Sequence, residues 1–109
     1  MRRIYLRTTV SGLALLAAAT FTFAQTGGET TYKAKCQMCH GATGAADTPA
    51  GKATNTKPFT DPILLKRSDA SILAVLNSGA GKMPGYKDKL TEHQLQEVLG
   101  YVRVLQKKK

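Results

Sequence analysis

The 109-residue sequence contains no tryptophan, only two cysteines and only two histidines. No stretch alternates apolar and polar residues as a half-buried strand does, and no internal repeat is visible. The lack of strand signals argues against a sheet protein and favours an all-α fold. The lack of tryptophan matters because a chain this short forms a barely adequate apolar core, so we expect an additional source of stability.

The N-terminal segment differs in character from the rest of the chain. It contains arginines near its start, an apolar run over residues 10–23 and a small residue at Ala24. This three-part pattern predicts a secretory signal peptide over residues 1–24, cleaved after Ala24. A retained membrane anchor is the alternative, but the apolar run is shorter than the about 20 residues that cross a bilayer. We therefore expect residues 25–109 to form a periplasmic domain that ends in a basic tail at 106–109.

Acidic residues are scarce, with seven Asp and Glu against sixteen Lys and Arg. The lysines are spread along the chain rather than gathered with aromatic residues, which argues against nucleic-acid binding. A basic surface can steer an acidic protein partner or simply aid solubility, and composition does not separate the two. The lysines considered for a partner-binding surface are Lys35, Lys52, Lys82 and Lys87.

Three helices are predicted from the spacing of apolar residues and from capping signals. The first covers residues 31–39, the second runs from Ser68 to a stop at Gly79, and the third begins with a capping box at Thr91. The segments between them, 41–62 and 79–89, are rich in glycine and contain proline, and they are predicted to be loops.

Both cysteines occur in the stretch CQMCH, residues 36–40, and three kinds of site compete for it. A disulfide or a thiol redox site is one alternative, although a redox CxxC usually accompanies a βαβ pattern that this sequence lacks. A zinc site needs about four ligands, and beyond Cys36 and Cys39 the mature chain offers only His40 and His93. CxxCH is the pattern of covalent haem attachment, in which two thiols bond to the haem and the histidine ligates its iron. We favour haem attachment and keep a plain disulfide as the alternative.

Helix geometry explains this spacing. Cysteines three residues apart project to the same side of a helix, and the histidine that follows them is then placed beneath the haem ring. Met38 is confined between the two cysteines, so we predict that it lies at the surface or fills space rather than binding iron.

An iron held by His40 has a sixth coordination position, for which Met83 and His93 are the candidates. Pro84 biases Met83 away from helical geometry, and the neighbouring glycines allow close approach to a flat cofactor. His93 lies at the polar start of the last helix and is predicted to be exposed. We therefore favour Met83 as the ligand.

The mature chain resembles small single-haem class I cytochromes c of bacteria over its whole length. The motifs that carry the resemblance are CxxCHG at 36–41, GAGKMPGY at 79–86 and GYVRVL at 100–105. The resemblance implies an all-α cytochrome c fold of three to four helices around one covalently bound haem c. It also implies that His40 and Met83 bind the iron from opposite faces.

Two further contacts are implied by the same resemblance. The first and last helices of the family cross through a glycine or aromatic contact, so Tyr32 and Tyr101 are expected to meet. A backbone carbonyl commonly holds the ring of the ligating histidine, and Pro49 is the natural choice for His40.

Iron with both axial positions filled transfers electrons rather than activating oxygen, so we expect an electron carrier and not an enzyme. The predicted function is to carry one electron between larger redox proteins, a donor and an acceptor. The alternative is a dedicated haem subunit or electron acceptor of a dehydrogenase or oxidase. The apolar residues expected to keep water from the ring are Ile63, Leu64, Leu65, Ile72, Leu73, Leu76, Val98 and Val102.

Overall fold

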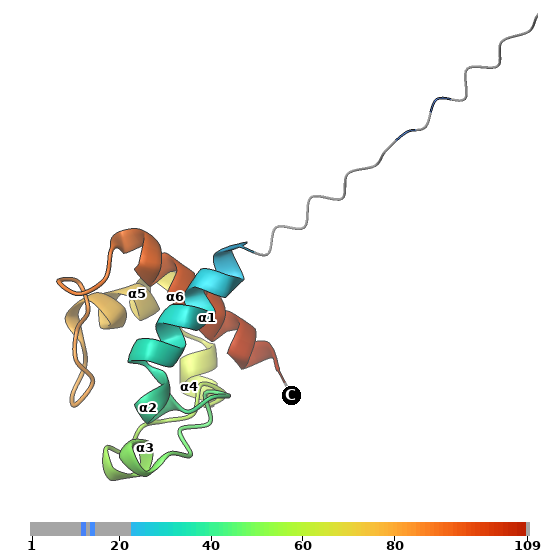
Figure 1. Ribbon diagram of the computed structural model, residues 1–109. Helices are drawn as coiled ribbons and strands as arrows, with labels where there is room; N and C mark the ends of the chain where they lie inside the picture. The colour runs from blue at the N-terminus through green and yellow to red at the C-terminus, as the bar shows by residue number, and fades with distance from the viewer. Residues whose placement is uncertain (1–11, 13, 15–22, 109) are drawn as a thin grey trace, which may run out of the picture.

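The computed structural model describes residues 12, 14 and 23–108. Within these residues the chain forms six helices and no strand, apart from an isolated β-bridge between Ala80 and Met83 (Figure 1). The all-α prediction is confirmed, but there are more helices than the three to four expected. The helices are α1 (Phe23–Lys35), α2 (Gln37–His40), α3 (Pro49–Ala53), α4 (Pro62–Leu65), α5 (Asp69–Ser78) and α6 (Glu92–Lys107).

The crossing of α1 and α6 organises the molecule. Gly28 is buried, and a Cβ atom at this position would collide with the backbone carbonyl of Glu97 and lie 3.2 Å from the Cβ of Tyr101. One turn further along α1, the rings of Tyr32 and Tyr101 pack with centroids 5.1 Å apart. The predicted contact between these tyrosines is confirmed. The absence of a side chain at Gly28 is what lets the two backbones approach.

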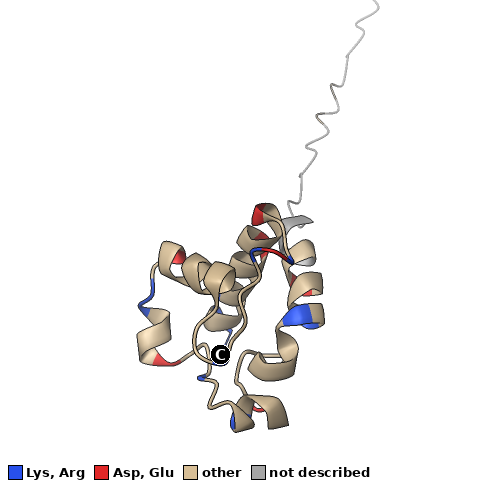
Figure 2. Ribbon diagram, turned by 90° about the vertical axis from the view of Figure 1, so that its left-hand side faces the viewer, with Lys and Arg blue, Asp and Glu red and all other residues tan. Residues whose placement is uncertain are grey.

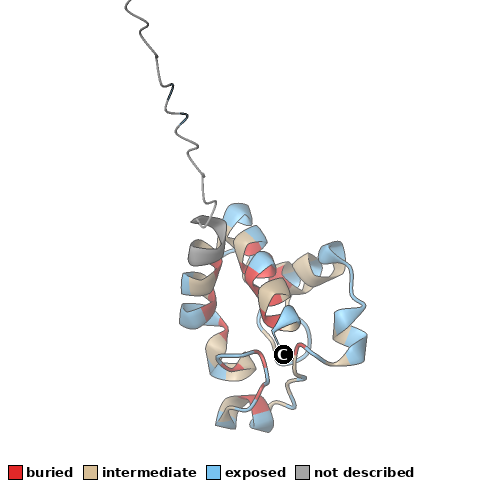
Figure 3. Ribbon diagram, turned by 90° about the vertical axis from the view of Figure 1, so that its right-hand side faces the viewer, coloured by how far each residue is buried: buried red, intermediate tan, exposed pale blue. Residues whose placement is uncertain are grey.

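Helix α6 supplies most of the core. Its start is fixed by the predicted capping box, in which the side chains of Thr91 and Gln94 each accept from the other residue's backbone N–H. The buried residues recur at helical spacing along one face, and Figure 3 shows them where α6 meets α1. They are Leu95, Val98, Leu99, Tyr101, Val102 and Leu105.

The first predicted helix is wrong in its bounds. The sequence suggested one helix over residues 31–39, whereas α1 begins at Phe23 and α2 is a separate short helix that starts after Cys36. Gly27 and Gly28 have low helix propensity, which hid the N-terminal half of α1. Packing against α6 outweighs that propensity.

The segment 41–62 is also more ordered than predicted, because it contains α3 and ends at the first residue of α4. Each helix has a side-chain cap, Thr48 for α3 and Asp61 for α4, followed by a proline at its first position. A capping residue followed by proline is a recognised helix start. The signal was therefore present in the sequence.

Part of the predicted apolar core is wrong, because two of its residues lie exposed on α4. Ile63 is 72% exposed and Leu65 is 46% exposed, so neither shields an interior group. The reason is that α4 is a single four-residue turn with no buried residue. By contrast Leu76, Val98 and Val102 are buried, as predicted, while Leu64 and two α5 residues, Ile72 and Leu73, are partly buried.

The predicted signal peptide falls almost entirely outside the described residues, and the predicted cleavage site after Ala24 lies in the first turn of α1. Among the described residues, no helix has both the length and the apolar character needed to span a bilayer.

Candidate haem site

The CQMCH stretch bridges two helices. Cys36 is the N-cap residue of α2 and His40 is its last residue, after which Gly41 turns the chain away at φ 80°. The carbonyl of Cys36 accepts hydrogen bonds from the backbone N–H groups of Cys39, at 3.3 Å, and His40, at 3.0 Å. Neither cysteine is in a disulfide, and burial raises the pKa of the Cys36 thiol to about 11. Both cysteines are therefore free thiols, and the raised pKa keeps the Cys36 thiol protonated.

Two cavities meet at these residues. The first, of about 300 Å³, is lined by Cys36, Cys39, His40 and Met83 together with several polar side chains. The second, of about 140 Å³, is lined mainly by apolar side chains and shares Cys36, His40 and Met83 with the first. The structure thus brings together all four residues that the sequence singled out.

His40 is held mainly by stacking. Its ring lies 4.7 Å from that of Phe59, centroid to centroid, with 23° between the planes. Phe59 is itself fixed by a 2.9 Å hydrogen bond from its backbone N–H to the carbonyl of Gly44, and a Cβ at Gly44 would collide with the Phe59 ring. Burial lowers the pKa of His40, which favours the neutral imidazole that binds metal ions.

The expected bond between the Pro49 carbonyl and the His40 ring is not found. The His40 Nδ1 atom is buried and has no hydrogen-bond partner among the described residues. Pro49 begins α3, so its carbonyl belongs to that helix rather than to the loop in which we expected it. A buried ring nitrogen without a hydrogen-bond partner lowers the stability of the folded protein.

Met83 lies in a tight hairpin between α5 and α6. The backbone N–H of Met83 donates to the carbonyl of Ala80 at 2.9 Å, and the N–H of Ala80 donates back at 3.1 Å. Gly81, at φ +55°, occupies the turn between them. The Met83 side chain is partly buried and packs against the core, which suits a residue directed toward an interior group.

Two glycines of this hairpin have a role that the sequence did not show. Gly79 and Gly85 let the hairpin approach itself and α5, while the approach of the hairpin backbone to a cofactor stays a prediction. A Cβ at Gly79 would lie 2.5 Å from the Met83 carbonyl oxygen, and one at Gly85 would lie 2.5 Å from the Asn77 carbonyl oxygen. These two positions set the path of the chain that carries Met83.

Sequence reasoning missed Thr48. Its hydroxyl donates to the carbonyl of Met38 at 2.6 Å, while its oxygen accepts from the backbone N–H of Gly51 at 2.9 Å. Gly51 in turn packs so closely on the Cys39 carbonyl that a side chain would collide with it. Together these contacts fasten α3 to the helix that holds the cysteines. The capping signal Thr-Pro could have located α3, but not this contact.

Tyr86, which lines the first cavity, was also not predicted from the sequence. The Tyr86 hydroxyl donates to the carbonyl of Lys35 at 3.1 Å, and its backbone N–H donates to the carbonyl of Leu76 at 2.8 Å. The only sequence signal was its place in the GAGKMPGY motif.

The alternative iron ligands lie elsewhere. His93 has a side chain that is 83% exposed and faces Glu97 on the next turn of α6, with 3.0 Å between His93 Nε2 and Glu97 Oε1. Met38 is 77% exposed. Both agree with the sequence-based expectation, and neither residue lines a cavity shared by Cys36 and His40.

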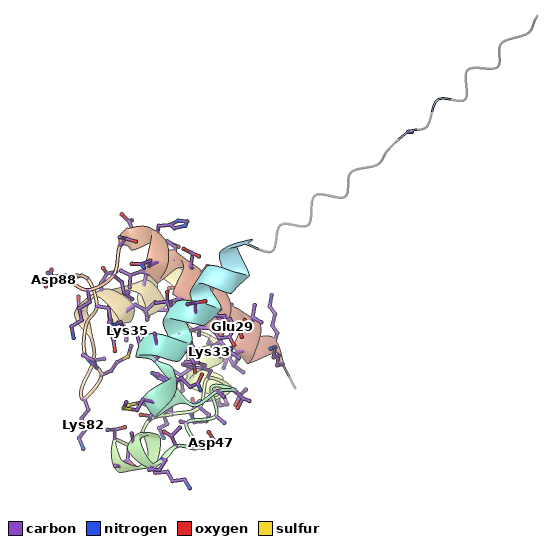
Figure 4. The ribbon with its side chains drawn as sticks, viewed as in Figure 1. Glu29, Lys33, Lys35, Asp47, Lys82 and Asp88 are labelled. Carbon is purple, nitrogen blue, oxygen red and sulfur yellow. The ribbon has the colours of Figure 1, made fainter. Side chains whose placement is uncertain are left out.

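Of the four lysines considered for partner binding, two flank the first cavity. Lys35 and Lys82 line it, Lys52 lines a separate shallow hollow, and Lys87 is exposed outside all three. Figure 4 shows Lys82 at the tip of the hairpin that carries Met83, and Figure 2 shows basic residues on several separate elements. The two lysines that line the first cavity are therefore positive and exposed, and we call the side of the cavity that they occupy its mouth.

These residues form a donor set that fits a covalently bound haem. Two thiols, a neutral imidazole and a thioether share one enclosure, and the second cavity supplies an apolar lining for a flat ring. A family model, that of cytochrome c oxidase, cbb3-type, subunit III, matches residues 23–102. The chain belongs to this family.

A solved structure supports the same conclusion. The KustC0563 c-type cytochrome is 30% identical to this chain and superposes with a TM-score of 0.67, over 73% of this chain and 98% of that one. No curated protein matches the chain in sequence. As a cytochrome c, the chain carries a covalently attached haem c with its iron, and its general function is haem-based electron transfer.

Proposed function

We propose that this cytochrome is a periplasmic carrier of one electron, whose haem is attached through Cys36 and Cys39 and whose iron is ligated by His40 and Met83. The observation that carries the proposal is the shared cavity: the four side chains come from two segments more than forty residues apart and line one enclosure. A chance CxxCH motif gives no reason for a methionine to be delivered to the same place.

When bound, haem c supplies a one-electron redox couple at its iron. The protein residues would fix the position of the ring, bind its iron and exclude water. Cys36 and Cys39 would hold the ring covalently, Phe59 orients the His40 ring that would bind the iron, and the Met83 thioether would favour the reduced metal and so raise the reduction potential. Leu76, Val98 and Val102 provide apolar cover. With both axial sites filled, the protein is expected not to be an enzyme.

The periplasmic location rests on the N-terminal segment. Its signal-peptide pattern supports export and cleavage after Ala24, leaving residues 25–109 as the mature domain with the basic tail at 106–109. Cleavage there removes part of the first turn of α1 and leaves the contacts of Gly28 and Tyr32 in place.

The redox partners are proposed to present acidic surfaces to the cavity mouth. Lys35 and Lys82 lie there and are exposed, so an acidic partner is attracted to the side from which electrons can enter or leave. Because the family is named for an oxidase subunit, the second candidate is a haem subunit of an oxidase complex. Purification from native membranes at a one-to-one ratio with a large partner supports this second candidate, whereas recovery as a free protein supports the carrier.

The decisive experiment replaces Met83 by Ala in the haem-loaded protein. The ferric wild type is expected to show the weak far-red band of sulfur-to-iron charge transfer, and the variant is expected to lose it while keeping its haem. The variant should also bind carbon monoxide readily in the ferrous state and gain peroxidase activity, whereas the wild type binds it slowly. His93→Ala is the matched control and should leave the spectrum unchanged. Absence of the band from the wild type, an unchanged spectrum in Met83→Ala and rapid carbon monoxide binding in His93→Ala would together transfer the axial role to His93.

A further inference from the structure

Tyr86 joins the hairpin that carries Met83 to the helix that leads into Cys36. Its hydroxyl donates to the carbonyl of Lys35 at 3.1 Å, across 51 residues of sequence. Lys35 is the last residue of α1, where the carbonyl groups of a helix lack partners within the helix. The bond therefore satisfies a helix end as well as linking two distant segments.

Tyr86 is also anchored on its other side. Its backbone N–H donates to the carbonyl of Leu76 near the end of α5, and its own carbonyl accepts from the N–H groups of Lys89 and Leu90, both at 2.9 Å. The ring is partly buried against the core, and the Nζ atom of Lys89 lies 5.6 Å from its centroid. Burial raises the pKa of Tyr86, so the hydroxyl stays protonated and can donate.

Met83 itself is fixed by fewer hydrogen bonds than Tyr86. Both of its backbone hydrogen bonds are to Ala80 within the same hairpin, and nothing lies within 4 Å of a Cβ built on Gly81 at the tip. These bonds shape the hairpin but do not fix it to the cysteine side of the cavity. Among the residues that the structure describes, the hydrogen bond that does so is that of the Tyr86 hydroxyl, three residues further along.

We propose that Tyr86 is a positioning residue that latches the Met83 hairpin to the end of α1 and so sets how often Met83 leaves the iron. This inference rests on the proposed function, because it assumes that Met83 is the axial ligand. An external ligand reaches the iron only while the hairpin is displaced. Losing a hydrogen bond that holds the hairpin closed raises the displaced population, by about threefold to tenfold for a bond of ordinary net strength.

The test measures the rate of cyanide binding to the ferric haem protein. Tyr86→Phe keeps the ring and its packing but removes the hydroxyl, and it is expected to bind cyanide about threefold to tenfold faster than the wild type. Its far-red band should weaken, because a fraction of the molecules lacks the sulfur ligand. Thr91→Ala is the matched control, since it also deletes a hydroxyl hydrogen bond, the 3.1 Å bond that the Thr91 oxygen accepts from the backbone N–H of Gln94 at the start of α6, and Thr91 lines neither cavity. The control should lose thermal stability without any faster cyanide binding.

The outcomes separate the two proposals. A wild-type cyanide rate in Tyr86→Phe, or an equal acceleration in Thr91→Ala, would overturn the latch and leave Met83 ligation intact. Fast cyanide binding by the wild type that Met83→Ala does not change would overturn the Met83 ligation, and the latch with it. Acceleration confined to Tyr86→Phe, together with a weakened far-red band, supports both.

Discussion

The hydroxyl of Tyr32 donates a buried 2.6 Å hydrogen bond to the carbonyl oxygen of Gly41, the residue that follows His40. The ring of the same tyrosine packs against Tyr101 of α6 and Phe59, at centroid distances of 5.1 and 6.2 Å. One side chain therefore ties the helix crossing to the chain that presents His40. The framework of the fold and the site are a single packed unit.

Tyr32→Phe should lower the free energy of unfolding by about 1–3 kcal/mol, because it leaves the buried Gly41 carbonyl without its partner. Chemical denaturation of the haem protein, followed by circular dichroism, measures this value. An unchanged midpoint would mean that water or a small rearrangement satisfies the carbonyl.

Two glycines offer a paired test of the helix crossing. Gly28→Ala should destabilise the protein by about 1–3 kcal/mol, because the added Cβ collides with the Glu97 carbonyl and forces the helices apart. Gly100 is exposed within α6, and a Cβ added there would have nothing within 4 Å. Gly100→Ala should therefore stabilise the protein by about 0.5–1 kcal/mol. Thermal melts of the two variants should shift in opposite directions. A shift of the same sign in both would contradict the crossing geometry.

Covalent attachment predicts a clear result from mass measurement. After extraction with acidified acetone, the wild-type polypeptide should keep the mass of one haem and begin near Gln25. Cys36→Ser and Cys39→Ser should each retain at most one covalent bond to the haem, and the double variant should lose the haem to the solvent. The variants are also expected to accumulate poorly, because the cofactor contributes much of the core. A wild-type mass equal to that of the bare chain would refute attachment.

Charge at the cavity mouth predicts a dependence on ionic strength. Oxidation of the ferrous protein by hexacyanoferrate(III), an anionic probe, should slow as salt rises, since the screening length falls from about 10 Å at 0.1 M to about 3 Å at 1 M. Lys82→Glu should lower the rate at low salt and flatten this dependence. Lys66→Glu serves as the control, because Lys66 is exposed at the end of α4 and lines none of the three cavities. Stopped-flow kinetics measures these rates. An equal dependence of the oxidation rate on salt in both variants would mean that the lysines act only through the net charge of the protein.

The sequence located the residues that line the candidate site better than the contacts that support them. Cys36, Cys39, His40 and Met83 were recognisable because the motifs that contain them fix their order and spacing. The hydrogen bonds of the Tyr86 and Thr48 hydroxyls could not be predicted, because each is accepted by a backbone carbonyl. Every residue has such a carbonyl, so the sequence does not mark which one accepts the bond. The early start of α1 was missed for a related reason, since Gly28 is selected by the neighbouring backbone of Glu97 rather than by local propensity.

Errors in the predicted core have a similar cause. Ile63 and Leu65 are apolar, but a helix as short as α4 cannot turn every side chain inward. The stacking of Phe59 on His40 depends on a chain reversal near Gly44 that no motif signals.

The order of the site residues along the chain bears on how the cytochrome is assembled. A polypeptide emerges from synthesis with its N-terminus first, so Cys36 and Cys39 appear well before Tyr86 and the whole of α6. During that interval the residues that later enclose the site are not yet folded around it, and the cysteines are open to a bulky, flat cofactor. Attachment can then precede closure, so that the chain folds around a haem already in place.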